Sequence, residues 1–194
     1  MNKKKSFKIY YLLLVEGKTE FNLFAYLTLK KFRELFAESN IQFSNKVEII
    51  KNGNQIISQG NLDGVGNLYS FKEKYNRIKK DKRYKRAKLF FVIDKDLDDT
   101  LEIERLIEQN GDIVQFVEYN FEHLLLRFGN KNPKNPSDFN SLADFRPYCK
   151  VEFQKQFKKK ASEFKDPDFD LIFSNIKDAE IRKSFSELFS TLSS

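Results

Sequence analysis

The feature that most constrains the fold is a short apolar run, Tyr10 to Val15, that ends at the carboxylate of Glu16. The run is too short to cross a bilayer, and its unbroken apolar character is typical of a strand buried on both faces of a parallel sheet. Gly17 allows a tight turn, and apolar residues then recur at helical spacing, which predicts a helix as far as about Ala37. Glu16 is therefore expected at the carboxyl end of a central strand, the edge where α/β proteins bind ligands.

Strand and helix patterns alternate along the first two thirds of the chain. Strands are predicted at 6–15, 46–51, 88–93 and 113–117, and helices at 17–37, 68–80, 100–109 and after Asn120. This alternation predicts an α/β fold with a parallel four-stranded sheet flanked by helices. A loop rich in Pro and Asn then precedes a basic, Phe-rich and mostly helical segment, 139–164, and a closing helix at 179–192. We therefore expect one domain over residues 1–130 and a helical C-terminal extension over 131–194.

A second acidic strand end follows the third predicted strand. Asp94 and Asp96 come directly after the apolar run at 88–93. The carboxyl ends of parallel strands meet at one edge of a sheet, so the strand end that bears Asp94 and the one that bears Glu16 are expected to lie side by side. Two nearby carboxylates repel each other unless a cation lies between them, which makes these side chains candidate cation ligands.

Other carboxylates are expected near the same edge. Glu20 lies in the first turn of the first predicted helix, and Glu122 lies in the first turn of the helix that Asn120 is expected to cap. Two roles stay open for Glu122, a cation ligand and a charge that complements the helix dipole. The same alternatives, capping of the next helix or cation binding, stay open for the Asp98-Asp99 pair.

The acidic motifs after the first and third predicted strands, Glu16-Gly17 and Asp94-x-Asp96, resemble those of TOPRIM domains. Such domains occur in topoisomerases, primases, ribonuclease M5 and the OLD-like and RloB-like nucleases. Glu122, just past the fourth predicted strand, is similar to the third acidic motif of the RloB-like and OLD-like proteins. The resemblance covers roughly residues 8–128 and implies a Rossmann-like TOPRIM fold for that part of the chain.

This resemblance implies a divalent-metal-dependent endonuclease that hydrolyses DNA or RNA in bacterial defence against phage, often beside an ATPase partner protein. Two other classes stay open: a primase-like or ribonuclease M5-like RNA-processing enzyme, and a non-enzymatic module that binds nucleic acid or a partner around a structural cation. A homodimer also stays open. The residues implied as catalytic and as cation ligands are Glu16, Glu20, Asp94, Asp96 and Glu122, with Glu16 as a ligand or a general acid/base.

Composition restricts the cation and the compartment. One histidine, His123, and one cysteine, Cys149, are too few for a His-rich or thiolate site, so carboxylate oxygens are the expected ligands, which favours Mg²⁺ or Mn²⁺ over Zn²⁺. No signal peptide is evident, a lone cysteine forms no internal disulfide, and no apolar segment is long enough to span a bilayer. We therefore expect a cytoplasmic protein without membrane association.

Positive charge is concentrated in one stretch of the chain. Lys72 to Lys88 contains ten basic residues, within a chain whose formal net charge is +7. Basic surface binds a phosphate backbone through counterion release, so a basic block beside an acidic site predicts a nucleic-acid partner, and a solvated helix surface is the alternative. The residues expected to bind nucleic acid are Lys18, Lys79, Lys80, Lys82, Arg83, Lys85 and Arg86.

Overall fold

The computed structural model describes residues 10–15, 17–27, 46–50, 67–85, 87–95, 99–174, 176–187 and 190. The strands are β1 (Tyr10–Val15), β2 (Lys46–Ile50), β3 (Ala87–Asp94) and β4 (Ile113–Val117). The helices are α1 (Lys18–Tyr26), α3 (Leu68–Lys80), α4 (Thr100–Gln109), α5 (Phe121–Phe128), α6 (Leu142–Phe157), α7 (Asp166–Phe173) and α8 (Asp178–Ser184), with short 3-10 turns that include η2 (Lys82–Tyr84) and η4 (Ala161–Glu163). Predictions for Glu16, Arg86, Asp96, Asp98, the remainder of the first helix and the segment between β2 and Asn67 lie outside the described residues.

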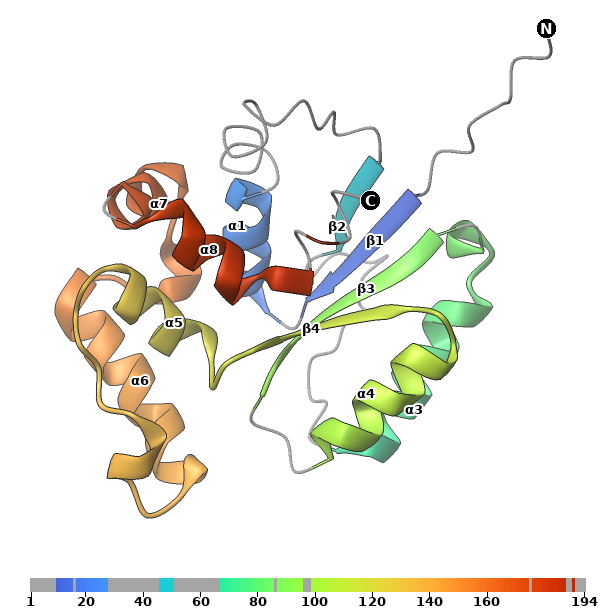
Figure 1. The fold of residues 1–194 in the computed structure, drawn as a ribbon, viewed down its shortest axis with the longest axis horizontal. Coiled ribbons are helices and arrows are strands. Elements are labelled where there is room, and N and C mark those ends of the chain that lie inside the picture. Colours follow the sequence, from blue (N-terminus) through green and yellow to red (C-terminus); the bar gives the residue numbers. More distant parts are fainter. Residues whose placement is uncertain are drawn as a thin grey trace, which may run out of the picture.

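The strands form a parallel sheet in the order β2-β1-β3-β4. Leu13 of β1 lies opposite Phe90 of β3, and Val92 of β3 lies opposite Gln115 of β4. Every observed strand pair is parallel, and helices cover the sheet (Figure 1). The prediction of a mixed α/β fold built on a parallel sheet is confirmed.

Alternate residues of β1 pack into cores on opposite faces of the sheet. Leu12 and Leu14 belong to a core formed with α3 and α4, whereas Leu13 and Val15 belong to a core formed with α1 and the helices that follow β4. Each of the four side chains is at most 1% exposed. Figure 1 shows α3 and α4 on one side of the sheet and α1 with α5 to α8 on the other. The apolar run is thus a strand buried on both faces, as its sequence predicts.

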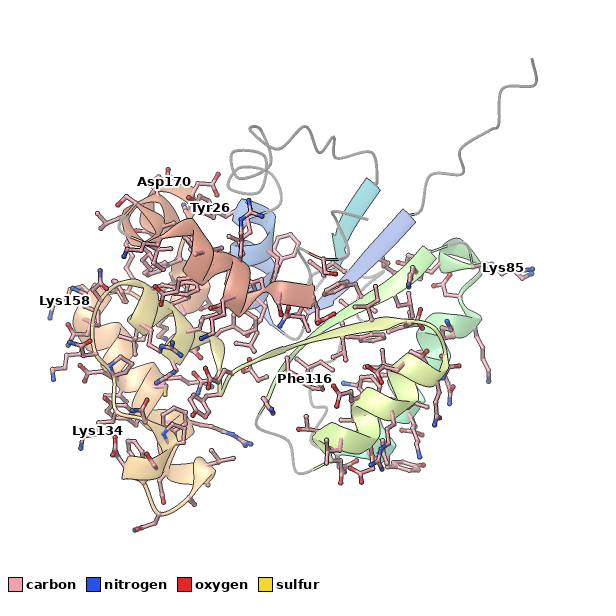
Figure 2. The ribbon with its side chains drawn as sticks, viewed as in Figure 1. Tyr26, Lys85, Phe116, Lys134, Lys158 and Asp170 are labelled. Carbon is pink, nitrogen blue, oxygen red and sulfur yellow. The ribbon has the colours of Figure 1, made fainter. Side chains whose placement is uncertain are left out.

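The helices after residue 130 share one apolar core with the sheet. Phe153 of α6, Phe169 of α7 and Ile181 of α8 lie in the same buried cluster as Leu13 of β1. Tyr26 of α1 stacks on Phe169 and Phe173, and its hydroxyl donates a hydrogen bond of 2.9 Å to Asp170 (Figure 2). The boundary at residue 130 stays a prediction, but the C-terminal helices pack against the sheet rather than around a core of their own.

The C-terminal helices differ in part from those expected. The sequence predicts mainly helix over 139–164, whereas α6 ends at Phe157, Lys158 adopts a left-handed conformation, and η4 follows. Asp166-Pro167-Asp168, which lies between the two helical segments expected at 139–164 and 179–192, begins α7. Proline is accommodated at the start of a helix because a backbone N–H at that position would have no acceptor within the helix. The Asp168 carboxylate accepts a hydrogen bond of 3.0 Å from the Lys165 N–H.

The side chains of Asn67 and Asp99 fix the loops at the carboxyl edge of the sheet through hydrogen bonds to backbone N–H groups. Asn67 caps α3 by accepting a hydrogen bond of 2.9 Å from the Ser70 N–H. Asp99 precedes α4 but makes no side-chain cap there, contrary to one of the two roles expected for it. Its carboxylate accepts instead from the Leu68 N–H at 2.7 Å. Asp99 therefore ties the start of α4 to the start of α3.

Candidate carboxylate site at the carboxyl edge of the sheet

The sheet brings two acidic strand ends to one edge. Val15, the last residue of β1, lies opposite Val92 of β3, and Asp94 is the last residue of β3. Because the two strands are parallel, the chain leaves both at the same edge, as the sequence predicts. Glu16 comes directly after Val15, and the positions of its own atoms and those of Asp96 lie outside the described residues.

Glu20 reaches this edge from the first turn of α1. Its Oε2 atom lies over Gly17 so closely that a Cβ atom on Gly17 would come within 2.7 Å of it, so a larger residue there would displace the Glu20 carboxylate. Burial raises the pKa of Glu20 to about 7, and the negative charge of Glu122 adds to this shift. Hydrogen bonds from the backbone N–H groups of Glu20 and Gly17 and the positive charge of Lys150 oppose it. Glu20 thus both caps α1 and interacts with a second carboxylate.

Glu122 approaches the same place from the first turn of α5. Asn120 caps this helix by accepting a hydrogen bond of 2.9 Å from the His123 N–H. Burial is the main cause that raises the pKa of Glu122, and the positive charge of Lys150 lowers it. Tyr119, three residues before Glu122, has a φ angle of 71°. This conformation is strained for an aromatic residue, and such strain occurs at functional sites.

Asp94 is placed in the same cluster by its effect on Cys149 of α6. The pKa of the Cys149 thiol is raised to about 11, mainly by burial and in smaller part by the negative charges of Glu122 and Asp94, against the effect of a hydrogen bond with the Asn120 side chain, which lowers it. Cys149, a residue of α6, is fully buried. Of the five predicted site residues, the structure thus brings Glu20, Asp94 and Glu122 close enough for their charges to act on shared neighbours.

The donor set fits a hard cation. Carboxylate oxygens are the ligands that Mg²⁺ and Mn²⁺ prefer, and a cation would relieve the repulsion that contributes to the raised pKa of Glu20. Among the residues that the structure describes, no group of three or more His, Cys, Asp and Glu side chains is close enough together to hold a metal ion. A complete ligand set therefore requires Glu16 or Asp96 in addition to the described carboxylates.

His123 does not belong to this carboxylate cluster. Its side chain has no exposed surface and makes edge-on contacts with the rings of Tyr119 and Phe145, at centroid distances of 5.2 and 5.4 Å. Burial, with a smaller effect of the Arg127 charge, lowers the pKa of the imidazole. A backbone group of Lys134 opposes this shift, although neither ring nitrogen makes a hydrogen bond of ordinary geometry to the described residues. His123 is thus a buried histidine enclosed by aromatic rings, separate from the carboxylates.

The basic block lies at the opposite edge of the sheet. Lys85 comes shortly before β3, whose first residue is Ala87, whereas Asp94 ends the strand, and Ala87 and Asp94 are about 23 Å apart along it. Figure 2 shows Lys85 on one side of the molecule and Lys158, which follows α6, on the opposite side. The expectation that the block lies beside the acidic strand ends is therefore wrong, because α3 and η2 return the chain to the amino edge of the sheet.

The individual basic residues of the block differ in their contacts. The Lys79 ammonium donates a hydrogen bond of 2.9 Å to Asp112, so its charge has a structural partner. Lys80, Lys82 and Lys85 are exposed, while the side chain of Arg83 and the whole of Arg86 lie outside the described residues. Their binding of nucleic acid stays a prediction. Lys18, the remaining residue of that set, lies at the start of α1 and therefore at the carboxyl edge.

A cleft opens beside the carboxylates and is lined by residues that the sequence did not single out. It has a volume of about 360 Å³ and lies between α1, α5, α6 and η4. Its polar lining is Thr19, Glu122, Lys150, Gln154, Lys160 and Ser162; we call it the α6 cleft. Lys150 and Lys160 belong to the segment expected only as a helical extension, and no local pattern distinguishes them from the neighbouring lysines.

The raised pKa of Glu20 predicts a pH-dependent stability. The folded protein holds this proton up to a pH of about 7, whereas the unfolded chain releases it near the ordinary value of 4.5. The contribution of Glu20 to stability is therefore most favourable below pH 4.5 and falls as the pH rises to 7, by on the order of 3 kcal/mol. Urea unfolding of the wild type and of Glu20→Gln across this range measures the difference. A difference that stays constant with pH would contradict the assignment, and Glu118→Gln, an exposed carboxylate at the same edge, is the control.

Comparisons of the chain with protein-family models, with curated proteins and with solved structures found no match. Within the described part of the chain, no helix combines the length and the apolar composition that a bilayer span requires. The fold defines a mixed α/β protein built on a parallel sheet, and the elements that carry Glu20, Asp94 and Glu122 meet at the carboxyl edge of that sheet.

Proposed function

We propose that this protein is a divalent-metal-dependent nuclease that hydrolyses phosphodiester bonds, with a TOPRIM-type site on a four-stranded sheet. The observation that carries the proposal is the convergence of Asp94, Glu20 and Glu122 at the edge where β1 and β3 end. The motifs around Glu16 and Asp94 resemble those of RloB-like and OLD-like nucleases, which also suggests a role in defence against phage.

The residues of the site divide into cation ligands and groups that move protons or stabilise charge. Asp94, Asp96, Glu20 and Glu122 would hold the cation, which supplies charge neutralisation at the phosphoryl oxygens. Glu16, after β1, would accept or donate the proton of the attacking or leaving oxygen. Lys150 contributes positive charge beside Glu20 and Glu122, where it would stabilise the charge that develops on the phosphate.

Incubation with nucleic acid tests the function directly. The purified full-length chain is mixed with plasmid DNA and, separately, with total RNA, in Mn²⁺, in Mg²⁺ and in excess EDTA. We expect cleavage with either cation and none in EDTA, because the proposed site lacks a charge-neutralising group without its cation. Cleavage that persists in EDTA would exclude the proposal.

The same experiment separates the other functional classes. Cleavage of a single structured RNA would indicate a processing enzyme of the ribonuclease M5-like or primase-like kind. Absence of cleavage, together with an increase in melting temperature on addition of Mn²⁺, would favour a binding module with a structural cation. An ATPase partner is tested by adding cell extract to an inactive preparation and measuring whether cleavage then depends on ATP.

A further inference from the structure

Two adjacent clefts lie on either side of η4. The α6 cleft, next to Glu122, is described above. A second cleft of about 420 Å³, here called the α1 cleft, is lined by Lys18, Asn22, Ser162, Glu163, Lys165 and Asp166 among others. Ser162 of η4 lines both clefts, so they adjoin each other along this turn.

The wall between the clefts is held in place by α1. The Asn22 side chain donates hydrogen bonds to the backbone carbonyls of Ser162, at 3.3 Å, and Phe164, at 3.1 Å. Phe164 is buried and packs against Phe153 and Phe169 at ring-centroid distances of 4.9 and 5.6 Å. The clefts are therefore formed by fixed elements and do not depend on a surface loop.

Lysines line both clefts. Lys150 and Lys160 line the α6 cleft, and Lys18 and Lys165 line the α1 cleft. All four are exposed, and within the described ranges none of them has a carboxylate partner in an ion pair.

Neighbouring lysines in the same segment are already neutralised. Lys155 pairs with Glu152 at 3.4 Å and Lys159 with Asp168 at 2.6 Å. The four lysines that line the clefts differ from these two because their charges are not paired with any carboxylate that the structure describes. Three carboxylates among the described residues also line the clefts. Glu163 accepts a hydrogen bond of 3.1 Å from the Lys160 N–H. Glu122 belongs to the proposed catalytic site, and Asp166 lies at the start of α7.

We propose that the two clefts form one track for single-stranded nucleic acid. The track leads from Lys160 and Lys165, on either side of η4, to the carboxyl edge of the sheet. The lysines that line the clefts bind the phosphates, and the clefts, of about 360 and 420 Å³, take unstacked bases against their apolar lining. A duplex keeps its bases stacked inside and cannot place them there. This inference rests on the proposed nuclease, to which it adds the substrate class and a role for the C-terminal helices.

Binding in the absence of cleavage tests the track separately from the nuclease. Fluorescence anisotropy is measured in EDTA with labelled oligothymidylate, oligouridylate and a mixed-sequence duplex, each of about 12 nucleotides or base pairs per strand. We expect both or one of the single strands to bind more tightly than the duplex, and the tighter of the two indicates whether DNA or RNA is the substrate.

Matched double variants locate the binding surface. Lys160→Gln with Lys165→Gln is expected to weaken single-strand binding at least about tenfold at low salt and to reduce the slope of log K against log salt by about 1.4, the value for two phosphate contacts. Lys155→Gln with Lys159→Gln removes the same charge from the same segment but outside the clefts, where each lysine is already paired with a carboxylate, and is expected to weaken single-strand binding much less. Melting temperatures of both variants verify that they are folded.

Four results would overturn the track: no binding of either single strand, a preference for the duplex, binding that is unaffected in the Lys160, Lys165 variant, or a loss of binding in the Lys155, Lys159 variant that equals that in the Lys160, Lys165 variant. Cleavage plays no part in these measurements. A chain that binds single strands through the clefts but never cuts them would therefore refute the nuclease alone, and a nuclease whose binding is unaffected at Lys160 and Lys165 would refute the track alone.

Discussion

Replacement of Asp94 by Asn is expected to lower the rate of metal-dependent cleavage by more than about 100-fold. Loss of a residue that only orients a metal ligand costs up to about 100-fold, and loss of a ligand itself should cost more. Asparagine keeps the shape of the side chain and removes its negative charge. Asp94 ends β3, and its charge acts on Cys149 together with that of Glu122, so its loss removes one of the carboxylates that define the edge. The rate is measured on whichever substrate the wild type cuts.

Glu118→Gln is the matched control for this loss. Glu118 follows β4 at the same edge, is 63% exposed in its side chain and pairs with Arg127 at 3.1 Å, away from the cluster. An exposed ion pair contributes little to stability, so cleavage by this variant is expected to remain close to that of the wild type.

A second measurement separates cation binding from catalysis. Mn²⁺ is expected to raise the melting temperature of the wild type and of Glu118→Gln, because a ligand that binds only the folded state stabilises it. The increase is expected to be much smaller in Asp94→Asn. An Asp94→Asn protein that keeps both the wild-type rate and the full Mn²⁺ effect would exclude Asp94 as a ligand.

Much of the fold could be predicted because its signals are local. The bounds of α3, α4, β4 and α5 agree with those expected, since each begins or ends at a residue with a clear local role. Asn67 and Asn120 cap helices through their own side chains, and Gly111, with a φ angle of 72°, occupies the left-handed conformation that follows α4. The apolar runs of β1 and β3 were equally clear, because both faces of these strands are buried.

The site could be predicted only in part because it depends on contacts between distant segments. The convergence of strand ends follows from parallel pairing, which the alternating pattern predicts. The presence of Lys150 beside Glu122 depends instead on how α6 packs against α5, and nothing within α6 reports that. The basic block was misplaced for a related reason: charge density in the sequence does not say at which edge of the sheet a helix ends.

Asp112 provides the largest predicted effect on stability. This buried carboxylate directly precedes β4, at the edge opposite the proposed site, and it is 7% exposed. It accepts hydrogen bonds from the Tyr75 hydroxyl at 2.6 Å, the Lys79 ammonium at 2.9 Å and the Leu89 N–H at 3.0 Å. The three donors come from α3 and β3, so Asp112 joins both elements to the start of β4.

Asp112→Ala is expected to lower the free energy of unfolding by about 3 to 5 kcal/mol, because it leaves a partly buried ammonium and two buried donors without their acceptor. For a chain of this size the melting temperature should fall by on the order of 10 °C. Glu118→Ala, which breaks an exposed ion pair, is expected to cost less than about 1 kcal/mol and is the control for loss of a carboxylate.

Two further measurements test whether this network, and not a general loss of packing, causes the destabilisation. Burial and the hydrogen bond to Asp112 both raise the pKa of Tyr75, so Asp112→Ala should lower that pKa in a spectrophotometric titration. In a double-mutant cycle, Tyr75→Phe is expected to cost about 1 kcal/mol in the wild type and much less once Asp112 is gone. Because Asp112 lies at the amino edge, cleavage per folded molecule should be unchanged, whereas a loss of cleavage beyond the loss of folded protein would show that the two edges are coupled.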